Sequence, residues 1–513
     1  MSGVGVSSTS ARAAEAGSGA ADDGGNAVDA AIAAVLVSLI TEPGVCSLGG
    51  GAFVTIDPPA APMVTIDGYA EMPGRGLPSD RLGKGVREVH VAYGGGLDTT
   101  VGYGSIATPG ALAALGLAAS SYGVLPWRRL VEPAYEWARD GFALSRTSRL
   151  YLEYCGEGIF GWHRDSREAI HGHDGGLLEE GALVRIPGLA ESLLRIGELG
   201  VEDFYRGELA RAIAEDIEVN KGILTLRDLA SYEPIVRPPV RIGMKGWNLG
   251  TNPPPAIGGS TLAALLALTA EGPKAGWTEA GVREMVRIQR AVLEFREERL
   301  DSAEDIDAET RGLLEPSTLD GLRRKVQSGS TVHTSAVDSS GLACAITASA
   351  GYGSGVMPAG TGIWMNNSLG EQELTRRGLH AQAPGTRLPS NMAPTVGRAE
   401  NGAVLSLGSP GADRITSALY QTIVNFVNVG MPLELAVSHP RIHVERDARV
   451  VRASYERGVQ TGGLDIPVRE FEDLHMYFGG VAAALFSPGE GFVLASDPRR
   501  DGGTAVGGSG VAS

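Results

Sequence analysis

Cysteine is scarce in this chain of 513 residues, and the three cysteines are far apart. Cys46, Cys155 and Cys344 form no C-x-x-C spacing, so the sequence indicates neither a disulfide framework nor a zinc site. Long hydrophobic runs are also missing, because the apolar stretch 30–40 is too short to span a bilayer. The first residues lack a basic segment followed by an apolar block, so we expect no signal peptide, no membrane association and a cytoplasmic protein.

Basic residues are fewer than acidic ones: 44 Lys and Arg against 60 Asp and Glu give a net charge of -16 at pH 7. An acidic chain without a basic run argues against nucleic acid as a partner. No internal repeat or second module is recognisable, although the length alone would allow about three domains. Residues 301–330 are charged and then rich in Gly and Ser, which predicts an exposed linker.

What the sequence does contain is a nearly uncharged, small-residue segment at 329–341. Val332, Ala336 and Val337 are apolar among polar neighbours, which predicts a strand, and the turn signal Asp338–Gly341 is followed by a second apolar run at 342–346. We therefore expect a β-hairpin with Thr331 at the mouth of its first strand. On the residues alone, Thr331 is no more than a buried residue where a strand begins.

A second informative region lies near the N-terminus. Asn26 can cap a small-residue helix running to about residue 40, and Asp29 suits its first turn. A glycine run at 49–51 then precedes a strand that ends at Asp57. This run is not a dinucleotide fingerprint, since that motif follows a strand and opens a helix.

These segments resemble the γ-glutamyltransferase family of N-terminal nucleophile hydrolases, from about residue 25 to the mid-480s. The resemblance rests on four motifs, which are Gly24–Ala31 with the glycine run after it, Thr331–Ser335, Gly353-Ser354-Gly355 and Gly362–Asn367. It implies an α+β fold, a four-layer αββα sandwich with two central antiparallel sheets. It also implies cleavage between Ser330 and Thr331 into two interlocked pieces, residues 1–330 and residues 331–513, which form a heterodimer.

The resemblance makes Thr331 the nucleophile. A Thr at a new N-terminus can use its own α-amine as the base, and that amine titrates at about pH 7.7–8.0. An internal Thr has only an amide, so we expect an inactive precursor in which the Thr331 hydroxyl attacks the Ser330 carbonyl. His333 is then expected to be structural, because the amine is the base.

The same resemblance assigns the groups that stabilise the oxyanion. The loop Ser409–Arg414 matches one in which two adjacent main-chain N–H groups serve as donors, here those of Gly411 and Ala412; the alternative interpretation of this loop is a plain turn. Ser349 matches a hydroxyl that hydrogen-bonds the nucleophile. If the hairpin deletion lies before that position, Thr347 matches instead.

The expected substrate pocket departs from the family. An Arg that holds the α-carboxylate of a γ-glutamyl group is replaced by Ala70, and Arg75 is a nearby substitute. Ser390 and Asn391 match a Ser-Ser pair on the same carboxylate, and Glu371 is the candidate for binding the α-amine.

Three functions remain open at this stage. The first is hydrolysis or transfer of a γ-glutamyl or related acyl group of a small molecule through a Thr331 ester, with no metal or organic cofactor. The second is a relative with a changed substrate, either a side-chain amide acylase or a hydrolase that breaks a C–C bond in an antibiotic-type biosynthetic pathway. The third is a non-catalytic scaffold that is never processed, which would stay a single band on a denaturing gel.

Overall fold

The computed structural model describes most of the chain, namely residues 3–91, 96–270, 277–300, 306–314, 331–372, 374–375, 377–411, 413–447 and 450–508. Two of the expected site residues, Ser330 and Ala412, lie outside these ranges.

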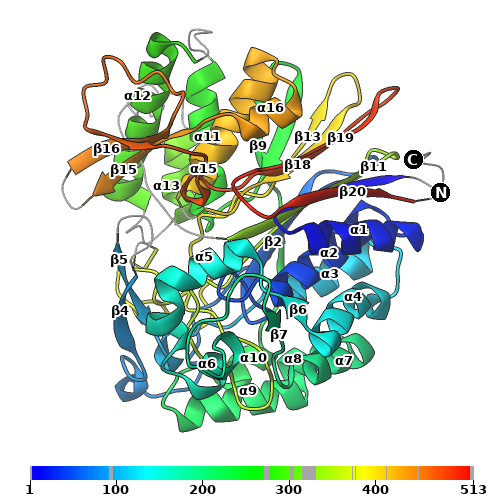
Figure 1. The fold of residues 1–513 in the computed structure, drawn as a ribbon, viewed down its shortest axis with the longest axis vertical. Coiled ribbons are helices and arrows are strands. Elements are labelled where there is room, and N and C mark those ends of the chain that lie inside the picture. The colour runs from blue at the N-terminus through cyan, green and yellow to red at the C-terminus, as the bar shows by residue number, and fades with distance from the viewer. Residues whose placement is uncertain are drawn as a thin grey trace.

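Two antiparallel sheets form the centre of the molecule (Figure 1). The first has the strand order β20 (Gly503–Gly507), β1 (Val4–Ser8), β11 (Val332–Asp338), β12 (Ala343–Ser349), β2 (Gly51–Asp57), β3 (Val64–Gly68) and β8 (Ile235–Arg237). The second has the order β19 (Gly491–Ser496), β18 (Ala482–Ser487), β14 (Val404–Gly408), β13 (Thr395–Ala399), β10 (Trp247–Thr251) and β9 (Val240–Met244). Strand β11 contacts β14 and β18 of the other sheet. An apolar cluster that includes Val337, Val396 and Ala484 lies between the sheets.

Helices cover both sheets. α1 (Ala11–Asp22), α2 (Ala27–Thr41) and α3 (Ala111–Tyr122) contact strands of the first sheet, whereas α11 (Ile257–Ala270), α15 (Arg414–Ile423) and α16 (Leu433–Ser438) contact strands of the second. Figure 1 shows these groups below and above the sheets. The predicted α+β class is therefore confirmed.

Helix α2 lies directly behind the predicted hairpin and contacts both of its strands. It begins where the sequence predicts, because the Asn26 side chain accepts hydrogen bonds from the N–H groups of Val28 and Asp29. In return, the Asp29 carboxylate accepts a hydrogen bond from the Asn26 N–H. Every residue of α2 is buried, which agrees with its lack of a polar face. The hairpin thus rests on a rigid apolar support.

The remaining elements surround this centre. The helices are α4 (Trp127–Asp140), α5 (Arg146–Cys155), α6 (Arg164–Ile170), α7 (Leu189–Leu199), α8 (Glu202–Arg206), α9 (Glu208–Val219), α10 (Leu226–Ala230), α12 (Glu279–Phe295) and α13 (Ile306–Leu314). The strands are β4 (Arg87–Val91), β5 (Leu97–Val101), β6 (Phe142–Ala143), β7 (Leu183–Val184), β15 (Ile442–Asp447), β16 (Val450–Glu456) and β17 (Val468–Phe471). The prediction of a linker throughout 301–330 is wrong in part. Helix α13 lies inside it, and Leu313 is fully buried against the core beside the second sheet.

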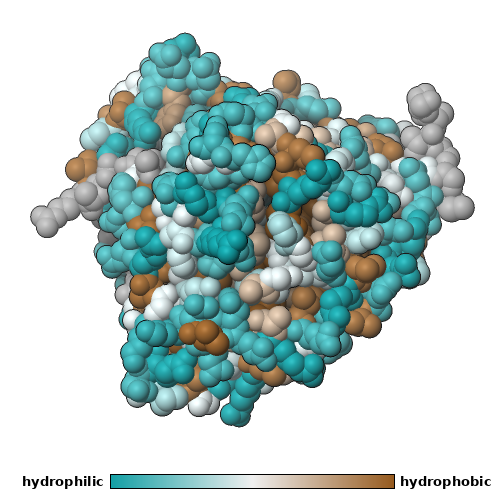
Figure 2. Space-filling model, turned by 60° about the horizontal axis from the view of Figure 1, so that its bottom comes forward, coloured by the Kyte–Doolittle hydropathy of each residue, from teal (hydrophilic) through white to brown (hydrophobic). Residues whose placement is uncertain are grey.

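Hydrophilic side chains predominate on the face shown in Figure 2, with hydrophobic ones in scattered groups. Among the described residues, no helix combines the length and the apolar character needed to cross a bilayer.

Candidate active site

Thr331 lies at the mouth of the hairpin, immediately before β11, and is 2% exposed. The two strands pair Val332 with Ala348, so continuing the register by one pair places Thr331 opposite Ser349. Residues directly opposite each other in an antiparallel pair share a face of the sheet. The register thus makes Ser349, and not Thr347, the cross-strand neighbour of Thr331.

Thr347 instead pairs with His333, and its hydroxyl lies 2.8 Å from Nδ1 of that ring. The other nitrogen, Nε2, lies 2.8 Å from the hydroxyl of Ser335. Burial lowers the pKa of His333 to about 3, so the ring is neutral at working pH. With both nitrogens engaged by hydroxyls, this histidine has no nitrogen left for proton transfer to Thr331.

The expected oxyanion loop follows β14, whose last residue packs on the His333 ring. An ideal Cβ on Gly408 would lie 2.3 Å from that ring, so only glycine fits there. Gly411 has a φ of +125°, and a Cβ on it would lie 2.6 Å from Cα of Gly479. Ser409 ties this loop to the neighbouring segment, because its hydroxyl accepts a hydrogen bond of 3.0 Å from the Gly480 N–H. The loop therefore begins against the hairpin at Gly408, and its main chain at Gly411 packs against Gly479.

Glu371 and Tyr69 form a buried polar pair beside the end of the hairpin. The Tyr69 hydroxyl donates to Oε1 of Glu371 over 3.3 Å, and Glu371 is 2% exposed. An ideal Cβ on Gly351, two residues after Ser349, would lie 3.0 Å from the Glu371 carboxylate. Burial, followed by the nearby Glu371, raises the pKa of Tyr69 well above its usual value. A buried carboxylate thus lies next to the Thr331 end of the hairpin.

Asn391 is 4% exposed, yet neither its Oδ1 nor its Nδ2 has a hydrogen-bond partner among the described residues. Its neighbour Ser390 is held firmly: the Ser390 carbonyl accepts hydrogen bonds from the N–H groups of Ile257 (2.7 Å) and Gly258 (3.0 Å) at the start of α11. Leaving a buried amide unpaired costs about 1–3 kcal/mol per group. Such a side chain is suited to hydrogen-bonding a ligand.

Arg75 is already paired within the protein. Its guanidinium lies 2.9 Å from Glu71 and 3.4 Å from Asp228. Ala70 is fully buried in an apolar cluster with Leu388 and Met392. The structure therefore surrounds position 70 with apolar groups, and the charge of Arg75 is balanced by two carboxylates.

Sequence reasoning missed Arg387, which supports this region. Its guanidinium donates to the carbonyls of Tyr69 (2.9 Å) and Glu233 (2.7 Å), and it pairs with Asp67 and Glu71 at 3.6 and 3.5 Å. No local pattern could have singled out this residue, because its partners come from two distant segments, residues 67–71 and 232–233.

The two asparagines at 366 and 367 hold the loops around the site. Asn366 donates to the carbonyls of Gly49 (2.8 Å) and Ala107 (3.0 Å), and Asn367 accepts from the Tyr352 N–H at 2.7 Å. The amide groups of both side chains are occupied by these hydrogen bonds to the protein. They therefore fix the main chain of the surrounding loops and do not face a substrate.

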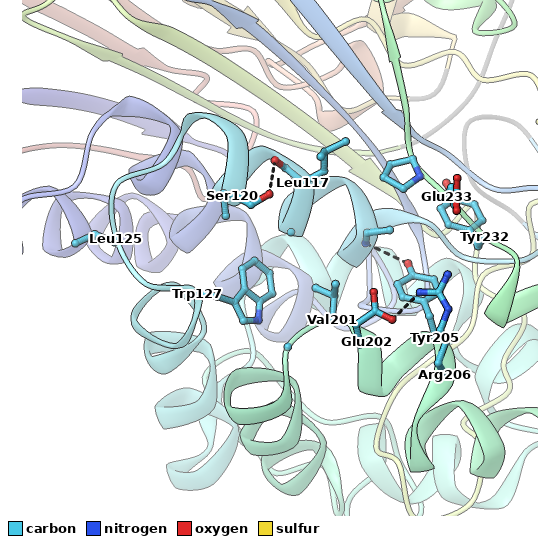
Figure 3. A pocket seen from close by; sticks show the side chains of 15 residues that line it. Leu117, Ser120, Leu125, Trp127, Val201, Glu202, Tyr205, Arg206, Tyr232 and Glu233 are labelled. Carbon is cyan, nitrogen blue, oxygen red and sulfur yellow. Dashed lines mark hydrogen bonds and ion pairs between the residues drawn. The ribbon is translucent and has the colours of Figure 1, made fainter.

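A cavity of about 560 Å³ lies elsewhere, between α3, the start of α4, α8 and residues 232–234. Figure 3 shows Trp127, Val201 and Tyr205 among its walls. None of the residues expected in the active site lines it. Its lining residue Tyr232 connects it to the site, because the Tyr232 hydroxyl donates to the Tyr69 carbonyl at 2.6 Å.

Comparison with known proteins assigns this architecture. Residues 13–507 match the family model described as gamma-glutamyltranspeptidase. The chain is 28% identical to a glutathione hydrolase proenzyme of Escherichia coli, over 96% of this chain and 90% of that one. It is also 28% identical to an acylase ACY 1 proenzyme of a Pseudomonas species, over 82% of this chain and 79% of that one.

Among solved structures, a cephalosporin acylase from Bacillus halodurans superposes with a TM-score of 0.81 at 22% identity, covering 98% of this chain and 95% of that one. At that identity the likeness speaks for the fold alone. The match of the family model over nearly the whole length decides the assignment. The chain belongs to the gamma-glutamyltranspeptidase family of N-terminal nucleophile hydrolases.

Proposed function

We propose that the chain cleaves itself between Ser330 and Thr331 and then hydrolyses or transfers an acyl group through an ester on Thr331. The observation that carries this proposal is the position of Thr331, buried at the mouth of the central hairpin, opposite Ser349 and beside the Glu371 carboxylate. The names of the two curated relatives, both proenzymes, support a processed chain.

Self-cleavage would begin with attack of the Thr331 hydroxyl oxygen on the Ser330 carbonyl carbon. The peptide C–N bond breaks, its nitrogen takes up the hydroxyl proton, and the acyl group is left as an ester on Thr331 with a free α-amine. Water then opens the ester, which leaves a carboxylate on Ser330. The product amine is the base that an N-terminal Thr needs.

Turnover repeats this chemistry on a substrate. The α-amine takes the proton of the Thr331 hydroxyl, the oxygen attacks the acyl carbon, and the leaving amine departs with that proton. Water or another amine then releases the acyl group. The N–H groups of Gly411 and Ala412 would bind the oxyanion, and the Ser349 hydroxyl would hold the Thr331 oxygen in line. This chemistry requires no metal or organic cofactor.

For the fold we propose a four-layer αββα sandwich made of two interlocked pieces, residues 1–330 and 331–513. The strand order supports it, because β11 and β12 of the second piece lie between β1 and β2 of the first. Cleavage before Thr331 would leave every strand pair intact, so the two pieces would stay together as a heterodimer.

For the substrate we propose a small molecule whose acyl group lacks a free α-carboxylate. A carboxylate buried without a cation is costly. Two described cations near position 70 already have partners: Arg75 has Glu71 and Asp228, and Arg387 has Asp67 and Glu71. The unpaired amide of Asn391, next to Ser390, favours an uncharged polar group there. A γ-glutamyl group is the second candidate, supported by Glu371 as a ligand for its amine.

The substrate proposal predicts the outcome of a comparison between two anilides. γ-Glutamyl-p-nitroanilide and 4-aminobutyryl-p-nitroanilide differ only in the α-carboxylate, so the ratio of their kcat/KM values reports how that group is bound. We expect the wild type to favour the 4-aminobutyryl compound by about tenfold or more, since an unpaired buried charge costs over 1.4 kcal/mol. Release of p-nitroaniline at one pH measures both.

Two variants control this comparison. Ala70→Arg supplies a cation and should shift the ratio toward the γ-glutamyl compound, whereas Ala70→Met adds similar length without charge and should not. A wild type that turns over the γ-glutamyl compound more efficiently would mean that another residue holds the carboxylate, and the second candidate would replace the first.

A further inference from the structure

We propose that the buried pair Asp413–His443 positions the main-chain turn at Gly411 and so controls the rate of acyl transfer without touching the substrate. The inference rests on the proposed function, because it takes this turn to supply the oxyanion donors. Neither residue was expected in the site from the sequence.

The pair joins the helix that follows the turn to the sheet behind it. Asp413 precedes α15 and is 3% exposed, and His443 belongs to β15 and is 2% exposed. His443 Nε2 lies 3.0 Å from the Asp413 carboxylate, and Nδ1 lies 2.9 Å from the hydroxyl of Ser417 on α15. One imidazole therefore holds the first residues of α15 at two points.

The charge on Asp413 is stabilised from a second side by Arg414. Burial raises the pKa of the Asp413 carboxyl, but Arg414 and then His443 outweigh burial and lower it to about 2. Arg414 is anchored in turn, because its Nε donates to the Tyr477 carbonyl at 3.0 Å and its guanidinium lies 4.7 Å from the centre of the Tyr477 ring. A charged carboxylate with such partners has a well-defined position.

The position of Asp413 constrains the turn because the two are close in sequence. Asp413 is two residues from Gly411, whose carbonyl accepts a hydrogen bond of 3.0 Å from the Arg414 N–H. The main chain at Gly411 also lies close to that of Gly479, because an ideal Cβ on Gly411 would lie 2.6 Å from Cα of Gly479. Oxyanion donors act only within about 2.7–3.1 Å of the developing charge, and a misplacement of about 1 Å can cost about 10²-fold in rate. A less well-fixed Asp413 should therefore displace the oxyanion donors and lower the rate of acyl transfer.

Ser417, His443 and Asp413 also have the residue types of a second hydrolytic triad, but the geometry argues against that use. The Ser417 hydroxyl is on a residue 5% exposed and donates to the Arg414 carbonyl at 3.2 Å. A nucleophile needs access to its substrate, and this serine is enclosed by its own helix and by β15. The three residues are better explained as a support.

The test uses p-nitrophenyl acetate, a small activated ester that does not depend on the acyl pocket. The Thr331-dependent rate is the release of p-nitrophenol by the full chain minus that by Thr331→Ala, divided by the fraction of the chain that intact mass shows to be cleaved before Thr331. We expect Asp413→Asn and His443→Leu to lower this rate per active site by about tenfold to hundredfold. His443→Gln, which keeps an N–H directed at Asp413, should recover most of it.

Asp203→Asn is the matched control, because Asp203 is a buried carboxylate paired with Arg195 at 2.9 Å in the helices away from the hairpin. It should lower thermal stability and leave the rate per active site unchanged. If Asp413→Asn and His443→Leu behave like this control, the pair is purely structural and the inference is wrong. If the wild type itself has no Thr331-dependent rate, it is the proposed function that fails.

Discussion

Thr331→Ala is expected to remain one chain of 53.2 kDa and to lose turnover by about 10⁴-fold or more, as nucleophile removal does in other covalent hydrolases. Alanine keeps the backbone but has no hydroxyl, so neither the Ser330 carbonyl nor a substrate can be attacked. A denaturing gel reports the first effect and p-nitroaniline release the second.

Thr331→Ser is the matched control for this substitution. Serine retains the hydroxyl and loses only a methyl group, so both self-cleavage and turnover should continue at a reduced rate. If Thr331→Ala is cleaved at the same bond, or stays whole and is nevertheless active, then another residue is the nucleophile. Since Thr331 is 2% exposed, the folded state of each variant is checked by its melting temperature.

Ala412→Pro is expected to lower kcat by about 10²–10³-fold, the usual loss for one oxyanion donor. Proline removes the main-chain N–H, and this N–H is one of the two donors assigned to the loop. The expected loss lies in kcat, because the oxyanion exists only in the transition state and the intermediates. Steady-state kinetics on the preferred anilide measures it.

Ala412→Gly and Ala412→Ser both keep the N–H and should stay within a few-fold of wild type. They separate loss of the donor from a general change in the loop. A folded Ala412→Pro protein with nearly normal kcat would exclude the loop as the oxyanion site, and it would also remove the basis for a positioning role of Asp413 and His443.

Local patterns in the sequence were sufficient to predict the framework of the site. The turn signal at 338–341 defines the hairpin, and the Asn26 cap defines the start of α2, because both depend on residues a few positions apart. The α+β class and the family followed from motifs in the same regions. β1 and α1, which lie in the Ser- and Ala-rich residues 1–24, were not predicted. Strand β1 pairs with β11 and β20, which are distant in sequence, and α1 contacts β20 as well as the neighbouring α2.

Tertiary contacts decided what the sequence left open. Whether Ser349 or Thr347 faces Thr331 depends on strand register, and a short hairpin without an alignment does not fix it. From the sequence, Arg75 is a candidate to bind a substrate carboxylate, but in the structure its guanidinium pairs with Glu71 and Asp228. Arg387 was invisible for the same reason, because its partners are brought together only by folding. Ser330 and Ala412 remain predictions from the sequence.

The intact mass of the purified wild-type chain tests the central claim most directly. The account predicts two polypeptides in equal amounts, the smaller one beginning at Thr331 and ending at Ser513, with a combined mass that exceeds the full chain by one water molecule. A wild-type protein that stays full-length and is active, or a smaller polypeptide that begins at any other residue, would contradict it.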